Sequence, residues 1–150
     1  MIENRYIKTM IMVIMVIYVM LLGYVFFIDS FKVMTLNEYI NTSTNFVPLK
    51  SIMSYLHLLI NGDISLIEIF FNLFCNIILY IPFGFVLPII NLELLKQHRL
   101  YKLMFTLIII ASLIQIILKI GFFDIDNVIL QMIGVMIGYH FLITKKGYVM

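Results

Sequence analysis

The stretch GFFDIDNVILQMIGVMIGYHFLI, residues 121–143, has two aspartates near its start and then continues almost without charge for the width of a membrane. A carboxylate at the edge of hydrocarbon costs free energy unless a partner or water stabilises it. Polar or small residues recur in the stretch at alternating spacings of three and four: Asp124, Asn127, Gln131, Gly134 and Gly138. Such spacings place side chains on one helical face. The stretch therefore predicts a helix over about residues 127–143 with a polar stripe that starts at its charged end.

The composition of the whole chain indicates a membrane protein. Hydrophobic residues make up 63% of the 150 residues and charged residues 12%, whereas soluble domains are roughly 45–50% apolar and about 25% charged. A chain this apolar has too few polar residues to cover the surface of a water-soluble globule. We therefore expect one membrane domain over residues 1–150. The net charge of +2 and the absence of a basic run give no reason to expect a nucleic-acid partner. The expected partner is the lipid bilayer, and the oligomeric state stays open.

Four stretches are long and apolar enough to be spanning helices, which need about 20 predominantly apolar residues. They are predicted at about 9–28, 66–90, 103–120 and 127–143. Basic residues flank the ends that would share one side of the membrane: Arg5, Lys8, Lys96, Arg99, Lys102, Lys145 and Lys146. Because basic residues are enriched in cytoplasmic segments, we expect both termini in the cytoplasm. The predicted fold is an all-α integral membrane protein with four transmembrane helices.

The segment 29–65, which would then lie outside, has room for structure of its own. Residues 41–48, NTSTNFVP, indicate a loop, since a proline such as Pro48 disfavours helix in the residue before it. Residues 50–62, KSIMSYLHLLING, have apolar positions at spacings of three and four and predict one short amphipathic helix on the membrane surface. His57 has no second histidine or cysteine at metal-binding spacing, so we expect neither a metal nor a cofactor.

Two other predicted spans carry polar stripes of their own. Asn72, Asn76 and Tyr80 step by four, and Ser112, Gln115 and Lys119 are separated by three and four. At 1.5 Å per residue, Asn72, Asn76, Gln115 and Lys119 fall in the outer halves of their helices, and Ser112 falls near the middle. Polar side chains at that depth need partners or water, so the stripes are expected to form one cluster that opens outward. The candidate ligand-binding residues are Asn72, Asn76, Gln115, Asp124, Asp126 and Asn127. A purely structural role stays open, because such side chains often only bond to neighbouring helices, at about 0.6 kcal/mol each.

Small residues and a proline predict how the helices pack. Gly134 and Gly138 form a GxxxG pattern, which lets two helix backbones approach closely. Pro82, within YIPFGFVLP (80–88), lacks a backbone donor and should kink its helix. The kink is expected to open the outer half of that helix away from its neighbours.

Three segments resemble the VanZ-like membrane proteins: NFVPLKSI (45–52), NIILYIPFGFVLP (76–88) and SLIQ…IGFFDIDNVILQMIG (112–134). The positions that match the motifs of that family are Asn45, Pro48, Asn76, Pro82, Phe83, Gly84, Gln115, Asp124 and Gly134. The resemblance implies a protein of the bacterial cytoplasmic membrane that is linked to tolerance of glycopeptide antibiotics, above all the lipophilic teicoplanin class. It also suggests the ligand, either a lipophilic glycopeptide or a lipid-linked wall precursor.

The departures from the family pattern bear on the chemistry. Ser112 stands where the family has a glutamate, Asn127 where it has its second aspartate, and Gln131 where it has an asparagine. Acid–base catalysis needs positioned titratable groups, and only Asp124 and Asp126 remain. A binding role survives these replacements better than a catalytic one. Two alternatives stay open: a small scaffold or subunit that packs on another envelope protein, and an intramembrane lipid-modifying enzyme that uses Ser112 with Asp124.

Overall fold

The computed structural model describes residues 5–27 and 35–146, most of which are helical. The elements in chain order are α1 (Arg5–Phe27), α2 (Leu36–Ser43), β1 (Thr44–Asn45), α3 (Lys50–Asn61), α4 (Leu66–Ile78), α5 (Ile81–Ile90), the 3₁₀ helix η1 (Leu92–Leu95), α6 (Gln97–Leu118), β2 (Phe123–Asp124) and α7 (Ile125–Lys146). Among these described residues, four helical stretches are long and apolar enough to cross a membrane: α1, α4 with α5, α6 and α7. The prediction of four such helices is thereby confirmed. The predicted end of the first span at Ile28 and residues 29–34 lie outside the described residues.

The predicted helix over 66–90 is divided in two, and this corrects its expected continuity. Helix α4 ends at Ile78 and α5 begins at Ile81. Pro82 is in the first turn of α5, where its missing N–H would have had no helical partner. The Tyr18 hydroxyl of α1 donates a hydrogen bond of 2.7 Å to the Leu79 carbonyl oxygen at the break. The proline is therefore accommodated as a helix start and not as a kink within one helix.

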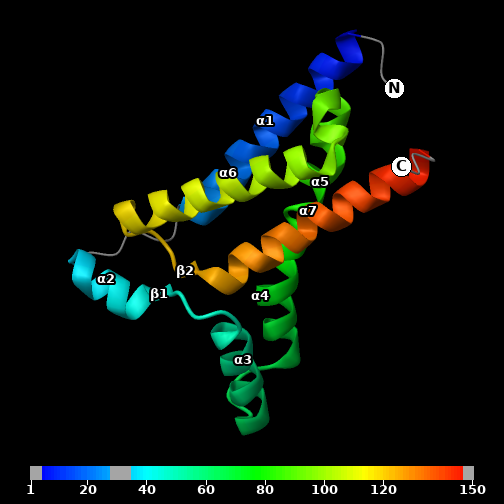
Figure 1. Cartoon of the computed structure of the whole chain (residues 1–150). Coiled ribbons are helices and arrows are strands. Elements are labelled where there is room, and N and C mark those ends of the chain that lie inside the picture. The colour runs from blue at the N-terminus through cyan, green and yellow to red at the C-terminus, as the bar shows by residue number, and fades with distance from the viewer. Residues whose placement is uncertain (1–4, 28–34, 147–150) are drawn as a thin grey trace.

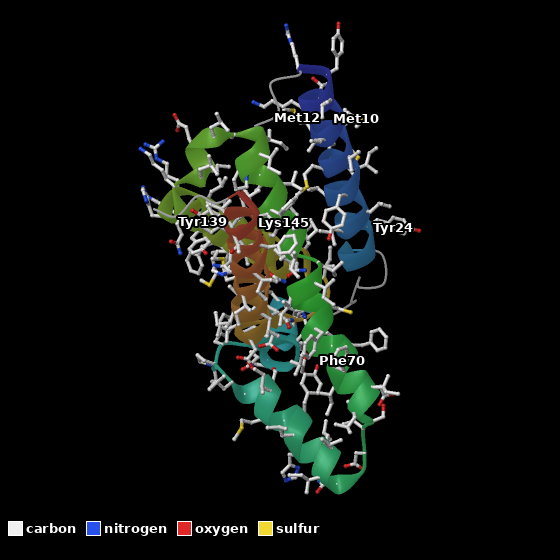
Figure 2. The ribbon with its side chains drawn as sticks, turned by 90° about the vertical axis from the view of Figure 1, so that its right-hand side faces the viewer. Met10, Met12, Tyr24, Phe70, Tyr139 and Lys145 are labelled. Carbon is white, nitrogen blue, oxygen red and sulfur yellow. The ribbon has the colours of Figure 1, made fainter. Side chains whose placement is uncertain are left out.

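The other long helices start before their predicted bounds, although α6 ends at Leu118, two residues before its predicted end. Helix α6 starts at Gln97, six residues before the predicted start, and α7 runs over 125–146 instead of 127–143. At 1.5 Å per residue, the 22 residues of α7 are about 33 Å long, which is enough to span hydrocarbon. Tyr24 of α1 and Phe70 of α4 project away from the bundle (Figure 2) and are 62% and 53% exposed. An apolar exterior of this kind is consistent with a multi-pass membrane protein.

The segment between α1 and α4 contains one helix more than predicted. Residues 41–43 were expected in a loop but belong to α2, which starts with a capping box formed by Thr35 and Glu38. Strand β1 then pairs in parallel with β2, with Thr44 opposite Phe123 and Asn45 opposite Asp124. Helix α3 matches the predicted amphipathic helix and ends at Asn61, where the C-cap residue Gly62 has a φ of 80°. The strand pair attaches this segment to the start of α7.

Helix α7 packs against α4, α5 and α6, and three glycines permit its close approach to α4 and α5. A Cβ atom on Gly84 would lie 2.0 Å from the Val135 carbonyl oxygen, and one on Gly138 would lie 2.0 Å from that of Ile81. A Cβ on Gly134 would come within 2.2 Å of the Ile77 carbonyl oxygen. Any side chain would therefore push the helices apart. The GxxxG face is covered within the chain by α4 and α5.

Helices α1, α6 and α7 run in broadly similar directions, whereas α4 and α5 cross them steeply (Figure 1). The first turn of α1 and the last turn of α7 lie towards the upper right of that view. The elements α2, β1 and β2 lie at the opposite end, at the left. This second end, called here the Asp124 end, brings together segments far apart in sequence and contains the candidate site.

Candidate functional site

A polar cavity of about 430 Å³ lies at the Asp124 end, between α2, β1, α3, α4 and the start of α7. Most of its lining side chains are amides and hydroxyls. The lining residues are Asn41, Thr42, Ser43, Thr44, Asn45, Lys50, Ser51, Ser54, Tyr55, Asn72, Asn76, Phe122, Phe123, Asp124 and Asn127. Two of these carry a formal charge, Lys50 and Asp124. The wall can thus offer many neutral donors and acceptors together with one group of each sign.

Asp124 is held in this wall by the strand pair. Its Oδ1 atom accepts hydrogen bonds of 3.0 Å from the Asn45 side-chain amide and of 3.0 Å from the Asp126 backbone N–H. The same Asn45 amide donates to the Ser51 hydroxyl at 3.0 Å. Because β1 places Asn45 opposite Asp124, the pairing of the two short strands fixes the position of the carboxylate.

Asp126 has a different environment, because it is only 1% exposed. Its carboxylate accepts hydrogen bonds from three backbone N–H groups at the start of α3: Leu49 at 2.5 Å, Ser51 at 3.0 Å and Ile52 at 3.3 Å. The N-cap residue of α3, Leu49, has a φ of 65° and makes no side-chain cap of its own. A carboxylate at a helix N-terminus satisfies unpaired donors and complements the helix dipole. Asp126 is thus the cap of α3, supplied from α7.

Both aspartates were expected at the mouth of the cluster, and the structure separates them. Asp124 lines the cavity, whereas Asp126 lies behind its wall. Through its bonds to α3, Asp126 positions the cavity residues that α3 contributes, Lys50, Ser51 and Ser54 among them. Tyr55, also from α3, has a pKa raised first by burial and then by the charge of Asp124. Its phenol therefore remains a neutral donor at physiological pH.

The polar stripes of α4 and α7 face one another and form a chain of three amides. The Asn76 amide nitrogen donates to the Asn127 side-chain oxygen at 3.0 Å, and the Gln131 amide nitrogen donates to the Asn76 side-chain oxygen at 3.3 Å. Asn76 also donates to the Asn72 backbone carbonyl at 3.0 Å. Polar groups at this depth are stabilised by such mutual bonds. We call Asn76, Asn127 and Gln131 the amide chain.

The stripe of α6 lies apart from the polar cavity. Ser112 and Gln115 line a second, largely apolar cavity, and the Ser112 hydroxyl donates to the Ile108 carbonyl oxygen at 2.9 Å. Ser112 and Asp124 line different cavities, so the structure does not bring together the pair that an enzyme of the proposed kind would use. Within residues 5–27 and 35–146, no group of three or more metal-ligating side chains could hold a metal ion.

The structure thus brings together four of the six candidate residues, namely Asn72, Asn76, Asp124 and Asn127. Gln115 lies in the second cavity and Asp126 behind the wall. The motif residues have packing positions: Pro48 precedes the left-handed Leu49, and the Phe83 ring lies 5.8 Å from that of Tyr18.

Residues 41–44 and the α3 residues Lys50, Ser51, Ser54 and Tyr55 were missing from the sequence-based candidates although they form much of the wall. The signal for them was the NFVPLKSI motif, which marked this segment without showing where it packs. The capping-box spacing of Thr35 and Glu38 could have revealed α2.

Comparison with known proteins agrees with the motifs. The model of the family described as VanZ/LLP1 matches residues 13–146, a range that includes every residue lining the polar cavity. No curated protein and no solved structure matches the chain. Since the matched range is nearly the whole sequence, the chain belongs to the VanZ/LLP1 family.

Proposed function

We propose that this chain binds the polar part of a lipophilic ligand in the polar cavity and thereby raises tolerance to glycopeptide antibiotics of the teicoplanin type. The observation that carries the proposal is the cavity itself, about 430 Å³ of space lined mainly by amides and hydroxyls. Ligand sites commonly have volumes of roughly 300–1,000 Å³. Membership of the VanZ/LLP1 family supports a link to antibiotic resistance in general.

The proposed location is the bacterial cytoplasmic membrane, with both termini in the cytoplasm and the polar cavity open to the outside. The distribution of basic residues supports this orientation. Lys96 lies between η1 and α6, Arg99 and Lys102 lie in the first two turns of α6, and Lys145 lies in the last turn of α7. Such residues are enriched on the cytoplasmic side of membrane proteins.

The cavity wall favours a hydroxyl-rich ligand group. Side-chain amides both donate and accept hydrogen bonds, as do serine and threonine hydroxyls, and this suits the hydroxyls of a sugar. Lys50 could pair with one anionic group of the ligand. A lipophilic glycopeptide and a lipid-linked wall precursor both combine a hydroxyl-rich part with hydrocarbon. The function proposed for the protein is to bind or shield such a molecule at the outer face.

The test is a susceptibility panel in a bacterium that lacks the protein. Expression should raise tolerance to teicoplanin more than to vancomycin, because the proposed site requires a lipophilic ligand. Asn72→Ala, within the cavity wall, should reduce the effect. Asn61→Ala removes the same kind of group at the exposed end of α3 and should leave the effect unchanged. Equal susceptibility with and without well-expressed wild-type protein refutes the proposal.

The orientation has its own test by thiol labelling in a Cys75→Ser background, since Cys75 is exposed on α4. Ser54→Cys places a thiol on the cavity side of α3 and should react with a membrane-impermeant reagent in intact cells. Lys145→Cys should react only after the cells are permeabilised. A thiolate reacts only where water and the reagent reach it. The reverse labelling pattern would show that the cavity faces the cytoplasm.

A further inference from the structure

The second cavity has about 320 Å³ of space between α1, α5, α6 and α7. Its wall is mostly apolar, and its lining residues are Val19, Leu22, Gly23, Tyr80, Phe83, Met104, Leu107, Ile108, Ala111, Ser112, Gln115 and Gln131. Every contributing helix belongs to one of the four membrane-crossing stretches. The cavity is therefore at the depth where hydrocarbon is the surrounding solvent.

The polarity of this cavity changes along its length. On α6 the lining runs from Met104 to Gln115, which is about 16 Å at 1.5 Å per residue. The polar residues of α6, Ser112 and Gln115, are at the end nearer to the Asp124 end of the bundle. A length of about 16 Å is close to half of a hydrocarbon core of roughly 30 Å, the depth of one leaflet. The whole cavity, its polar end included, is thus about as long as one leaflet is deep, and its apolar part, from Met104 to Ala111 on α6, is about 10 Å long.

One hydrogen bond links the walls of the two cavities. Gln131 lines the apolar cavity, and its amide donates to Asn76, which lines the polar cavity. Asn76 in turn donates to Asn127 on the polar side. The amide chain is therefore the partition between a hydroxyl- and amide-lined space and a hydrocarbon-lined space.

The Gln115 side chain lies at the polar end of the apolar cavity. Gln115 is partly exposed, so its amide is accessible from the cavity. A polar side chain at membrane depth is stabilised by a hydrogen-bonding partner or by water. A polar linkage between the head and the tail of a ligand would provide a partner at this position.

We propose that the two cavities form one site for an amphiphile with a hydroxyl-rich head and a single hydrocarbon chain. The head occupies the polar cavity, the chain occupies the apolar cavity, and the junction between them lies against Gln131, Asn76 and Gln115. This inference rests on the proposed function and specifies its ligand class. Gly23 lines the apolar cavity, and a Cβ placed there has no atom within 4 Å, so the space beside it is open to the chain.

The experiment uses purified protein in phospholipid nanodiscs with an alkyl glucoside that carries a photoreactive diazirine in its chain. After illumination, mass spectrometry should find labels on α1 and α6 residues that line the apolar cavity, and excess unlabelled glucoside should compete. Gly23→Leu should lower this labelling roughly tenfold or more, because the added side chain fills space that the probe needs. The variant should still fold, since leucine has the higher helix propensity and meets no neighbour at Cβ.

Val13→Leu is the matched control, because Val13 is 52% exposed on α1 and does not line the cavity. It should label like the wild type. A diazirine alkyl alcohol of the same chain length lacks the sugar and should label the cavity weakly and without competition by the glucoside. Labelling that is equal for glucoside and alcohol, or unchanged in Gly23→Leu, overturns the inference.

A third probe, with the diazirine on the sugar, separates this inference from the proposed function. If the sugar probe labels α3 at the polar cavity while the chain probe labels only lipid-facing residues, the two-cavity site is refuted and head-group binding stands. If the sugar probe also labels no residue of the polar cavity, both proposals fail. We expect both cavities of the wild-type protein to be labelled, and we expect Gly23→Leu to lose the label in the apolar cavity.

Discussion

Asp126→Ala should release the start of α3 from α7. The substitution removes a carboxylate that is 1% exposed and accepts hydrogen bonds from the backbone N–H groups of Leu49, Ser51 and Ile52. These groups belong to the N-cap residue and the first turn of α3 and have no helical partner of their own. Alanine offers no acceptor, so the three donors must find water or remain unpaired. We expect the first turn to fray and the α3 side of the polar cavity to loosen.

The magnitude follows from the geometry of the three bonds. Hydrogen bonds to charged groups contribute roughly 1.5–3 kcal/mol each. The bond to Ile52, at 3.3 Å, is longer than usual and therefore weak. Water can replace part of the loss, because Leu49 and Lys50 are exposed. We therefore expect a loss of about 3 kcal/mol, which exceeds the roughly 0.5–2 kcal/mol of an ordinary N-cap. Asp126→Asn retains one acceptor oxygen and should lose less.

Amide hydrogen exchange in nanodiscs measures this effect locally. A loss of about 3 kcal/mol corresponds to roughly a hundredfold faster exchange at Leu49, Ser51 and Ile52. Exchange in the middle of α7 should stay slow. Asp63→Ala, which removes an exposed carboxylate beyond the end of α3, is the control and should leave all three amides as in the wild type. Wild-type exchange at these amides in Asp126→Ala would refute the capping role.

Three further predictions concern packing, a buried hydroxyl and an acid-sensitive cap. Gly138→Ala should sharply reduce the yield of folded protein, because the alanine Cβ would lie 2.0 Å from the Ile81 carbonyl oxygen. Gly23→Ala is the control and should not reduce the yield, since the space at its Cβ is open. Size-exclusion chromatography in detergent measures the yield of both variants. Tyr39→Phe removes a buried hydroxyl that donates to the Ile120 carbonyl oxygen at 2.9 Å, and it should destabilise the protein by about 1–3 kcal/mol in thermal unfolding. Tyr24→Phe, at an exposed position, should leave the stability unchanged. Backbone and side-chain hydrogen bonds from Thr35 lower the pKa of Glu38. The α2 cap should therefore be fully formed above the ordinary glutamate pKa and should be lost as the pH falls through the lowered pKa of Glu38. An NMR titration of Glu38 with a midpoint at or above 4.5 contradicts this.

The long helices could be predicted from the sequence because their signal is local. Runs of about 20 apolar residues indicate spans without any knowledge of tertiary contacts, and the steps of three and four from Asp124 to Gln131 indicate one helical face. The facing of Asn76 and Asn127 followed from the same periodicity together with depth. The division of the second span was less accessible, because Pro82 is compatible both with a kink and with a helix start.

The wall formed by residues 41–55 could not be predicted in the same way. It depends on a two-residue parallel strand pair, which joins Asn45 to Asp124 across 79 residues of sequence. So short a pairing leaves no periodic pattern in the sequence. The same holds for Asp126, because its bonds are to backbone N–H groups, which every residue except proline possesses. A sequence shows which carboxylates are present but not which distant helix start one of them caps.

The departures from the family pattern acquire a physical meaning in this arrangement. Asn127 stands at a position where relatives are expected to have an aspartate, and here its side-chain oxygen accepts a hydrogen bond from Asn76. Two amides can each donate and accept, so Asn76, Asn127 and Gln131 satisfy one another without any ionised group. A carboxylate at 127 would only accept, and at membrane depth its charge would need a cation or a proton. The amide chain therefore keeps the partition between the cavities neutral, which is what the proposed site for a hydroxyl-rich group beside hydrocarbon requires.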